Sequence, residues 1–396
     1  MTEKTRTQPT LRPETLSAQG LGHIAEPYRD IVEPIHLATT YVRDRNGELV
    51  GGRLYARDAN PAYDQPEALL ARLENGWEAL LLPSGMAAAQ ALLQLLKPGE
   101  RLVVPRSMYW ALRSWIRHYT AHLGITLVEY DNASLDSLKA ALAGETTRLL
   151  WIETPANPTW DVTDIAAASV LGHSVGARVV VDSTVATPVL SRPLELGADF
   201  VMHSATKYLN GHSDVIAGAV VAREDSEDWQ AIRRHRNQGG AILGGFEAWL
   251  LLRGMRTLFP RVRTASRSAQ AIAEWLDAHP QVIEVRYPGL PGDPNHAVAA
   301  RQMEGGFGGM LSIRVQGGHA GARRFAGALQ LFREATSLGS VESLVEHRAP
   351  VEGPGTLCPD DLLRLSIGIE AVEDLIADLA QALDSPHHPP EDYDES

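Results

Sequence analysis

The sequence predicts an α/β fold in which a doubly wound, mostly parallel sheet is followed by a smaller α+β unit. Short apolar runs alternate with helical patterns from about residue 59 to 258, which is typical of parallel βαβ units. These runs are rich in Val and Leu, as in strands that are buried on both faces. A chain of 396 residues, 44% of them hydrophobic, is long enough for two packed domains.

Each element follows from its local pattern. The runs expected as strands are 101–105, 125–130, 148–153, 177–182 and 199–203. The segments with helical patterns are 87–96, 164–176, 261–278 and 372–383. The resulting units are an irregular, proline-interrupted arm (1–58), a large domain (59–258), a smaller α+β domain (259–384) and a disordered tail (385–396).

Composition excludes several classes of protein. A formal charge of −13 argues against a nucleic-acid partner, because an acidic surface repels phosphate backbones. The single cysteine, Cys358, rules out an internal disulfide framework, fits a reducing cytoplasm and is expected to be an ordinary surface or packing residue. No apolar run is long enough to cross a bilayer, and residues 1–10 contain no apolar signal region. The 14 histidines show no paired spacing with carboxylates, so no metal is assigned.

One lysine stands in an unusual setting. Lys207 follows an apolar run and lies in Ser204–Gly218, a segment of small and hydroxylated residues. A desolvated amine loses its proton more readily and can condense with an aldehyde to form a Schiff base. The aldehyde that best suits this setting is pyridoxal phosphate, whose ring nitrogen needs a carboxylate, whose phosphate needs hydroxyl and N–H donors, and whose face needs an aromatic ring.

Two further segments could meet these needs. Asp182 ends the β-branched run 177–182, and open α/β sheets bind ligands at the carboxyl ends of their strands. Ser84, Gly85 and Met86 open a helical segment whose N-terminal N–H groups could hold a phosphate. Each feature also has a plainer interpretation, since Asp182 could cap the next turn and Ser84 could be a simple helix cap.

Taken together, these residues resemble the pyridoxal-phosphate enzymes of cysteine and methionine metabolism, the family of cystathionine γ-synthases, cystathionine β- and γ-lyases and methionine γ-lyases. The resemblance extends from about residue 16 to 383. It implies the aspartate aminotransferase-like fold type I, with cofactor binding in 59–258 and an arm that contacts a neighbouring subunit in a homotetramer of site-sharing dimers. The segments that carry it are 54–61, 82–88, 153–158, 181–188, 204–218, 337–344 and 362–370.

The resemblance also implies a role for each matching residue. Lys207 would carry the cofactor and transfer protons, and Asp182 would hold the ring nitrogen. Tyr109 would stack on the ring. His212, although it lies in the lysine segment, is expected only to support the loop. The remaining roles are phosphate binding by Gly85, Met86, Ser204 and Thr206, phosphate binding in the neighbouring subunit by Tyr55 and Arg57, and substrate binding by Asn157, Ser337 and Arg364.

The chain departs from the family pattern at the expected distal end of the substrate. Ala111 replaces the cysteine that is characteristic of methionine γ-lyases, and it follows the large side chain of Trp110. Leu54 and Thr336 stand where relatives often carry groups that recognise a distal ammonium. The segment 347–353 replaces a familiar Met-Thr-His sequence and adds Arg348 and Glu352. Glu352 could pair with a cationic leaving group, which suggests canavanine as a special substrate.

The predicted function is elimination or replacement of a γ-substituent on a homoserine- or homocysteine-type amino acid, as in cystathionine γ-synthase or γ-lyase. A cystathionine β-lyase or an O-acylhomoserine sulfhydrylase is the enzymatic alternative. A catalytically silent homologue that only binds the cofactor is the alternative from another class. The presence of Lys207, Asp182, Tyr109 and Arg364 together argues against the silent protein.

Overall fold

The computed structural model describes residues 11–144 and 146–385 and contains two β-sheets. The larger sheet has seven strands in the order β1-β7-β6-β5-β4-β2-β3. Its strands are β1 (Glu78–Leu82), β2 (Arg101–Pro105), β3 (Thr126–Tyr130), β4 (Leu149–Glu153), β5 (Arg178–Asp182), β6 (Phe200–His203) and β7 (Gly218–Ala222). All neighbours pair in parallel except β7, which runs antiparallel to both β1 and β6. The predicted mostly parallel sheet is therefore confirmed.

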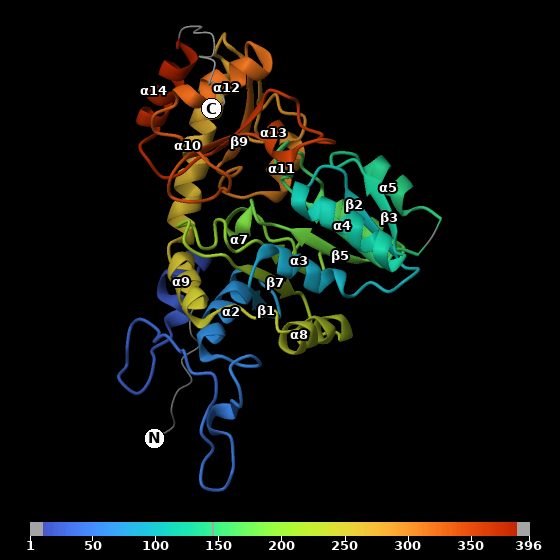
Figure 1. The fold of residues 1–396 in the computed structure, drawn as a ribbon, viewed down its shortest axis with the longest axis vertical. Helices are drawn as coiled ribbons and strands as arrows, with labels where there is room; N and C mark the ends of the chain where they lie inside the picture. Colours follow the sequence, from blue (N-terminus) through green and yellow to red (C-terminus); the bar gives the residue numbers. More distant parts are fainter. Residues whose placement is uncertain (1–10, 145, 386–396) are drawn as a thin grey trace, which may run out of the picture.

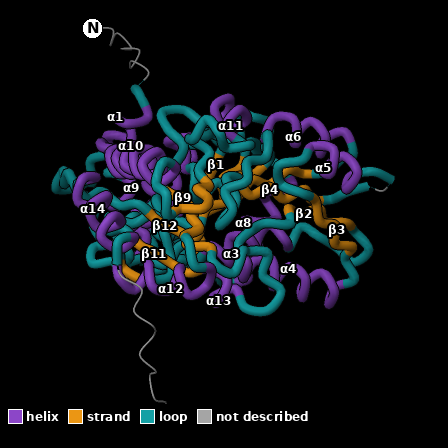
Figure 2. The backbone as a smooth tube through the Cα atoms, turned by 90° about the horizontal axis from the view of Figure 1, so that it is seen from above, coloured by secondary structure: helices purple, strands orange, loops and turns teal. Residues whose placement is uncertain are grey.

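Helices cover both faces of this sheet, which makes it doubly wound. Figure 2 shows α5 and α6 on one side of the strands and α3 and α4 on the other. Alternate strand residues enter two hydrophobic clusters: Val179 and Val181 of β5 join one, and Val180 joins the other. The helices of this part are α2 (Pro61–Leu73), α3 (Gly85–Leu93), α4 (Trp110–Leu123), α5 (Leu135–Leu142), α6 (Ile165–Ser174), α7 (Thr187–Leu190), α8 (Glu227–Gly239) and α9 (Gly245–Met255).

The long helix α10 (Leu258–Asp277) leads from this sheet to the second one, as Figure 1 shows. It presents apolar residues such as Ile272 and Leu276 to a third hydrophobic cluster. The second sheet has the order β10-β11-β12-β9-β8 and is antiparallel except between β10 and β11. The strands of this sheet are β8 (Val282–Arg286), β9 (Met310–Val315), β10 (Arg333–Glu334), β11 (Leu344–His347) and β12 (Leu362–Ser366). The helices of this part of the chain are α11 (His296–Gln302), α12 (Gly318–Ala328), α13 (Arg348–Glu352) and α14 (Val372–Leu383).

The segment before α2 contains little regular structure. It holds the helix α1 (Pro13–Gln19) and two short 3₁₀ turns, Gly20–Gly22 and Val50–Gly52. Helix α1 packs against α2 and α10, whereas the loops that follow it, drawn in blue in Figure 1, extend away from the body of the molecule. Several of its apolar side chains are exposed to solvent, and they include Tyr28, Ile31, Leu37 and Val42.

The predicted elements agree with the structure to within a few residues. The helix predicted at 372–383 is α14, and the amphipathic segment 261–278 lies within α10 or one residue past its end. The prediction of a disordered tail concerns residues 385–396, all of which except residue 385 lie outside the described residues. Among the helices that the structure describes, none is both long enough and apolar enough to span a membrane.

Candidate active site

The carboxyl ends of the parallel strands and the second sheet enclose a cavity of about 260 Å³. This location is where open α/β sheets bind ligands. Two predicted residues, Tyr55 and Arg57, do not line the cavity. The predicted residues that do line it are Gly85, Met86, Tyr109, Asn157, Asp182, Ser204, Thr206, Lys207, Ser337 and Arg364.

Lys207 lies in the loop between β6 and β7, where its backbone N–H donates to the carbonyl of Ser204 at 3.1 Å. Its ammonium nitrogen Nζ donates to the hydroxyl oxygen of Ser337 at 2.8 Å. Burial, together with the nearby guanidinium of Arg364, lowers the pKa of Lys207 to about 8. Roughly a tenth of such amines are unprotonated at pH 7, compared with well under a thousandth for an ordinary lysine. The amine is therefore prepared for condensation and proton transfer.

Asp182 ends strand β5 and is buried. Its Oδ1 accepts hydrogen bonds from the backbone N–H of Thr184 at 3.0 Å and from the Thr184 hydroxyl at 2.6 Å. Burial raises the pKa of Asp182, and within the described residues this carboxylate forms no ion pair. A buried carboxylate without a cation is suited to a ligand that brings a positively charged N–H.

Glu153 is a site residue that the sequence analysis missed. It ends β4 directly opposite Asp182 in the parallel register, so both carboxylates lie on the same face of the sheet. Its Oε2 accepts from the N–H of Tyr109 at 2.8 Å, and its Oε1 accepts from the N–H of Asn157 at 3.0 Å. Burial and the neighbouring Asp182 raise the pKa of Glu153 to about 8. Two adjacent strands that both end in a carboxylate were the signal that could have revealed it.

The N-terminus of α3 forms a second polar wall. Among the described residues, no acceptor is found for the N–H groups of Gly85 and Met86, as expected for the first residues of a helix. A β-carbon at Gly85 would lie 2.8 Å from the Cβ and Oγ of Ser204, so glycine is what allows Ser204 to approach the helix end. Ser204 and Thr206 both line the cavity, and Thr206 Oγ1 already donates to the carbonyl of Ala217 at 3.1 Å.

The opposite wall comes from the second sheet and is positively charged. Arg364 of β12 donates to Oδ1 of Asn157 at 3.2 Å and to the carbonyl of Ser337 at 2.8 Å. Burial, followed by the charge of Arg348, lowers the pKa of Arg364 to about 10. Ser337 has a φ of 110°, which a side chain rarely adopts and which costs about 1–3 kcal/mol. That strain is consistent with a residue held in place to contact Lys207.

Glu352 does not offer a free carboxylate to the cavity. Its Oε1 lies 3.0 Å from Nη2 of Arg348, and its Oε2 accepts from the Thr356 hydroxyl at 2.7 Å. The cavity is lined instead by Arg348 and Thr336. The pairing expected between Glu352 and a cationic leaving group would therefore require these two contacts to break.

The other predicted residues have simple surroundings. His212 Nδ1 lies 2.8 Å from the carbonyl oxygen of Asn210, in agreement with a loop-supporting role. Cys358 is buried, and burial raises its pKa to about 11, as suits a packing residue. Tyr55 and Arg57 are partly exposed on the arm, where the guanidinium carbon of Arg57 lies 5.7 Å from the Tyr55 ring centre. No group of three or more His, Cys, Asp or Glu residues in the described ranges is arranged to hold a metal.

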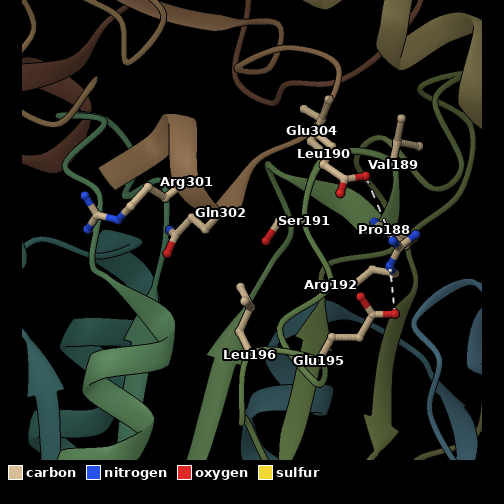
Figure 3. A pocket seen from close by; sticks show the side chains of 10 residues that line it. All are labelled: Pro188, Val189, Leu190, Ser191, Arg192, Glu195, Leu196, Arg301, Gln302 and Glu304. Atoms are coloured by element: carbon tan, nitrogen blue, oxygen red, sulfur yellow. Dashed lines mark ion pairs between the residues drawn. The ribbon is translucent and has the colours of Figure 1, made fainter. Parts of the chain in front are cut away.

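A second hollow, of about 100 Å³, lies between the segment around α7 and helix α11 (Figure 3). Its charged side chains pair with one another: Arg192 lies 3.1 Å from Glu195 and 4.0 Å from Glu304. Arg301, also on this hollow, pairs with Asp164 at 2.9 Å. None of the predicted site residues lines this hollow, so it is not part of the candidate active site.

The residues that line the 260 Å³ cavity match the groups of pyridoxal phosphate. Asp182 supplies the buried, unpaired carboxylate for the ring nitrogen. The helix end at Gly85 and Met86, with Ser204, supplies donors for the phosphate. Lys207 supplies the amine for the aldehyde, and Tyr109 supplies an aromatic ring on the same cavity.

Comparison with known proteins gives a consistent result. The family model described as "Cys/Met metabolism PLP-dependent enzyme" matches residues 14–384. Cystathionine gamma-synthase of Mycobacterium tuberculosis is 44% identical over 356 residues, covering 88% of this chain and 91% of that protein. L-methionine gamma-lyase of Pseudomonas deceptionensis is 40% identical over 370 residues, covering 89% of this chain and 92% of that protein. The structure of cystathionine gamma synthase from Xanthomonas oryzae in complex with cystathionine is 39% identical, covers 94% of this chain and 98% of that chain, and superposes with a TM-score of 0.90.

Proposed function

The chain belongs to the Cys/Met metabolism PLP-dependent enzyme family, and on that premise we propose that it eliminates or replaces the γ-substituent of homoserine- or homocysteine-type amino acids. One observation carries the proposal: Lys207, Asp182, Tyr109 and Arg364 all line a single cavity. A silent homologue would have no chemical need for this arrangement.

When bound, pyridoxal phosphate supplies the aldehyde carbon for the substrate amine and a ring that accepts electrons released at the α-carbon. Asp182 keeps the ring nitrogen protonated, because a buried carboxylate stabilises the positive charge there. Tyr109 would supply the aromatic face for the ring and help to activate the incoming amino group. Lys207, with its lowered pKa, would serve as general base for the α-proton of the bound substrate and then as the general acid that returns it.

Arg364 fixes the orientation of the substrate in this scheme. A guanidinium binds a carboxylate with two parallel hydrogen bonds, and the contacts to Asn157 and the Ser337 carbonyl hold its plane in place. Ser337 also receives the hydrogen bond from Lys207, so one loop residue links the carboxylate site to the base. This link supports the proposal that the α-carbon of the substrate binds within reach of the amine.

The distal wall favours a γ-substituent without positive charge. Both oxygens of Glu352 are engaged, one by Arg348 and the other by Thr356. A cationic guanidine or ammonium group would therefore find no open carboxylate at Glu352. We therefore place O-acylhomoserines and methionine-type substrates ahead of canavanine and of the second ammonium of cystathionine.

The experiment that tests the function is product analysis with the cofactor-loaded protein. O-acylhomoserines, methionine, cystathionine and canavanine are supplied separately, with and without cysteine as acceptor. Formation of 2-oxobutanoate shows γ-elimination, and formation of cystathionine from an O-acylhomoserine and cysteine shows γ-replacement. Pyruvate as the main product would assign β-elimination instead, homoserine from canavanine would restore the special substrate, and an absorbance that no amino acid changes would favour the silent homologue.

Tyr55 and Arg57 support a second part of the proposal, which is that two subunits share each site and that two such dimers form a tetramer. Both residues lie on the exposed arm and outside the cavity of their own chain, although the cofactor phosphate needs cations. The exposed apolar side chains of the arm are suited to packing against another copy.

A mixing experiment tests the shared site. One variant carries Arg57→Ala and the other carries Lys207→Ala, so that a mixed dimer has one site with both native residues. Recovery of activity on mixing two poorly active variants is expected, whereas a protein that stays monomeric and recovers nothing would contradict the proposal.

A further inference from the structure

Four buried side chains with alternating charges form a row that ends at Arg364. They are Glu352, Arg348, Glu346 and Arg364, and each is at most 5% exposed. Arg364 Nη2 lies 2.6 Å from Glu346 Oε2, and the same oxygen accepts from Arg348 Nη1. Arg348 Nη2 lies 3.0 Å from Glu352 Oε1. The row therefore contains two carboxylates and two guanidinium groups, with a formal charge of zero.

The fold fixes the order of this row. Glu346 and Arg364 are directly opposite each other on the antiparallel strands β11 and β12. Arg348 and Glu352 are the first and last residues of the one-turn helix α13, at the i and i+4 spacing that favours an ion pair. The two remaining carboxylate oxygens are held by Thr336, at 2.6 Å from Glu346, and by Thr356. Every carboxylate oxygen of the row is therefore paired with a guanidinium or a hydroxyl group, and the four side chains are shielded from solvent.

Glu346 presents an electrostatic problem for the site. A substrate carboxylate at Arg364 shares that cation with a carboxylate that is already 2.6 Å away, and Glu352 adds a second negative charge to the row. Buried charges are weakly screened, so an uncompensated carboxylate there would oppose the binding of another. Arg348 contacts both glutamates and is the cation that compensates them.

We propose that Arg348 is a positioning residue for the substrate carboxylate: by neutralising Glu346 and Glu352, it leaves the positive charge of Arg364 available to the cavity. The inference rests on the proposed function in one respect only, namely that a substrate carboxylate binds at Arg364.

The test uses the cofactor-loaded protein and two measurements. The first is the split between KM and kcat with the substrate that product analysis identifies. The second is calorimetric binding of propionate, a carboxylate without an amine, which reports on the carboxylate site without turnover. Arg348→Met leaves the row with a net negative charge and should raise both KM and the propionate dissociation constant by about tenfold, with kcat changed by less than about threefold.

A second substitution separates charge balance from structure. Adding Glu352→Gln to Arg348→Met returns the row to zero charge, so the double variant should recover most of the lost affinity. Glu352→Gln alone leaves a net positive row and should tighten propionate binding severalfold, which keeps the proposal testable even where Arg348→Met fails to fold. A purely structural role predicts the opposite, with the double variant weaker than either single variant.

Two controls complete the design. Arg314→Met removes an arginine that bridges Asp361 and Glu284 on the same sheet but does not line the cavity, and it should leave both measurements unchanged. Arg364→Lys should weaken propionate binding. Unchanged binding in the Arg364 variant would refute the carboxylate site itself and with it the proposed function. Weakened binding in that variant, with no effect of Arg348→Met or with no recovery in the double variant, would overturn only the role of Arg348.

Discussion

Lys207 should destabilise the cofactor-free protein at neutral pH. Its pKa falls from 10.5 to about 8 in the folded state because it is buried near Arg364. At about 1.4 kcal/mol for each pH unit, this fall corresponds to about 3 kcal/mol against the charged amine. Lys207→Met removes that penalty but also the hydrogen bond to Ser337, which offsets about 1 kcal/mol. The variant should therefore be more stable than the native protein by about 2 kcal/mol at pH 7.

The dependence on pH follows from the sign of the shift. A folded-state pKa below the unfolded value means that the unfolded chain binds more protons between about pH 8 and pH 10.5. The penalty is complete below pH 8 and has largely disappeared at pH 10.5, where the missing hydrogen bond to Ser337 should leave the variant up to about 1 kcal/mol less stable than the native protein.

Urea denaturation of both cofactor-free proteins at pH 7 and at pH 10.5 measures the difference. Lys139→Met, which removes an exposed lysine, is the matched control and should change stability little at either pH. A Lys207→Met variant that is less stable than the native protein at pH 7, or a gain that is the same at both pH values, would refute the reasoning.

Three further predictions concern the cavity. Glu153→Gln replaces one acceptor oxygen with an N–H₂ donor that faces the backbone N–H of Tyr109 or Asn157. Because one of these hydrogen bonds is lost, kcat should fall by about tenfold while the cofactor stays bound. An unchanged kcat would show that Glu153 does not position Tyr109 and Asn157. Asp182→Asn removes the negative charge that would pair with the ring nitrogen, so absorbance titration should show cofactor binding at least about tenfold weaker. Equal binding would contradict the assignment of Asp182 as the partner of the ring nitrogen. Gly85→Ala places a β-carbon 2.8 Å from Ser204 and should weaken binding of pyridoxal phosphate more than binding of pyridoxal, which lacks the phosphate; an equal effect on both would show that this helix end does not hold the phosphate.

The sequence was sufficient for those parts of the fold that depend on local pattern. The strand from 178 to 182 and the helix from 372 to 383 were predictable because apolar periodicity is a property of neighbouring residues. Strand β7 was not predicted, and its antiparallel place between β1 and β6 depends on pairing between distant segments. The strands of the second sheet were not predicted individually, for the same reason.

The candidate site shows the same division. Lys207 and Asp182 were recognised from their immediate neighbours in the chain. The surroundings of Glu352 were not recognised, because the sequence analysis considered only a cationic leaving group as its partner and did not foresee its ion pair with Arg348. Glu346 was overlooked altogether, since nothing near it in sequence indicates that β11 places it opposite Arg364. Charge pairing across strands depends on register, and register is a tertiary property.

The charges around the cavity separate into two poles, and this separation determines how a zwitterionic amino acid can enter. Glu153 and Asp182 form a carboxyl pole at the strand ends, where burial raises the pKa of both groups and the neighbouring Asp182 raises the pKa of Glu153 further. Lys207 and Arg364 form a basic pole of the cavity, where burial lowers both pKa values, the charge of Arg364 lowers the pKa of Lys207 further, and the charge of Arg348 does the same for Arg364. Each pole is unfavourable by itself, and each is relieved by a ligand of opposite charge: the protonated ring nitrogen at Asp182 and the substrate carboxylate at Arg364. The free energy that the folded protein loses in holding the like charges together is therefore recovered when cofactor and substrate bind, which links the stability of the empty protein to the affinity of the loaded one.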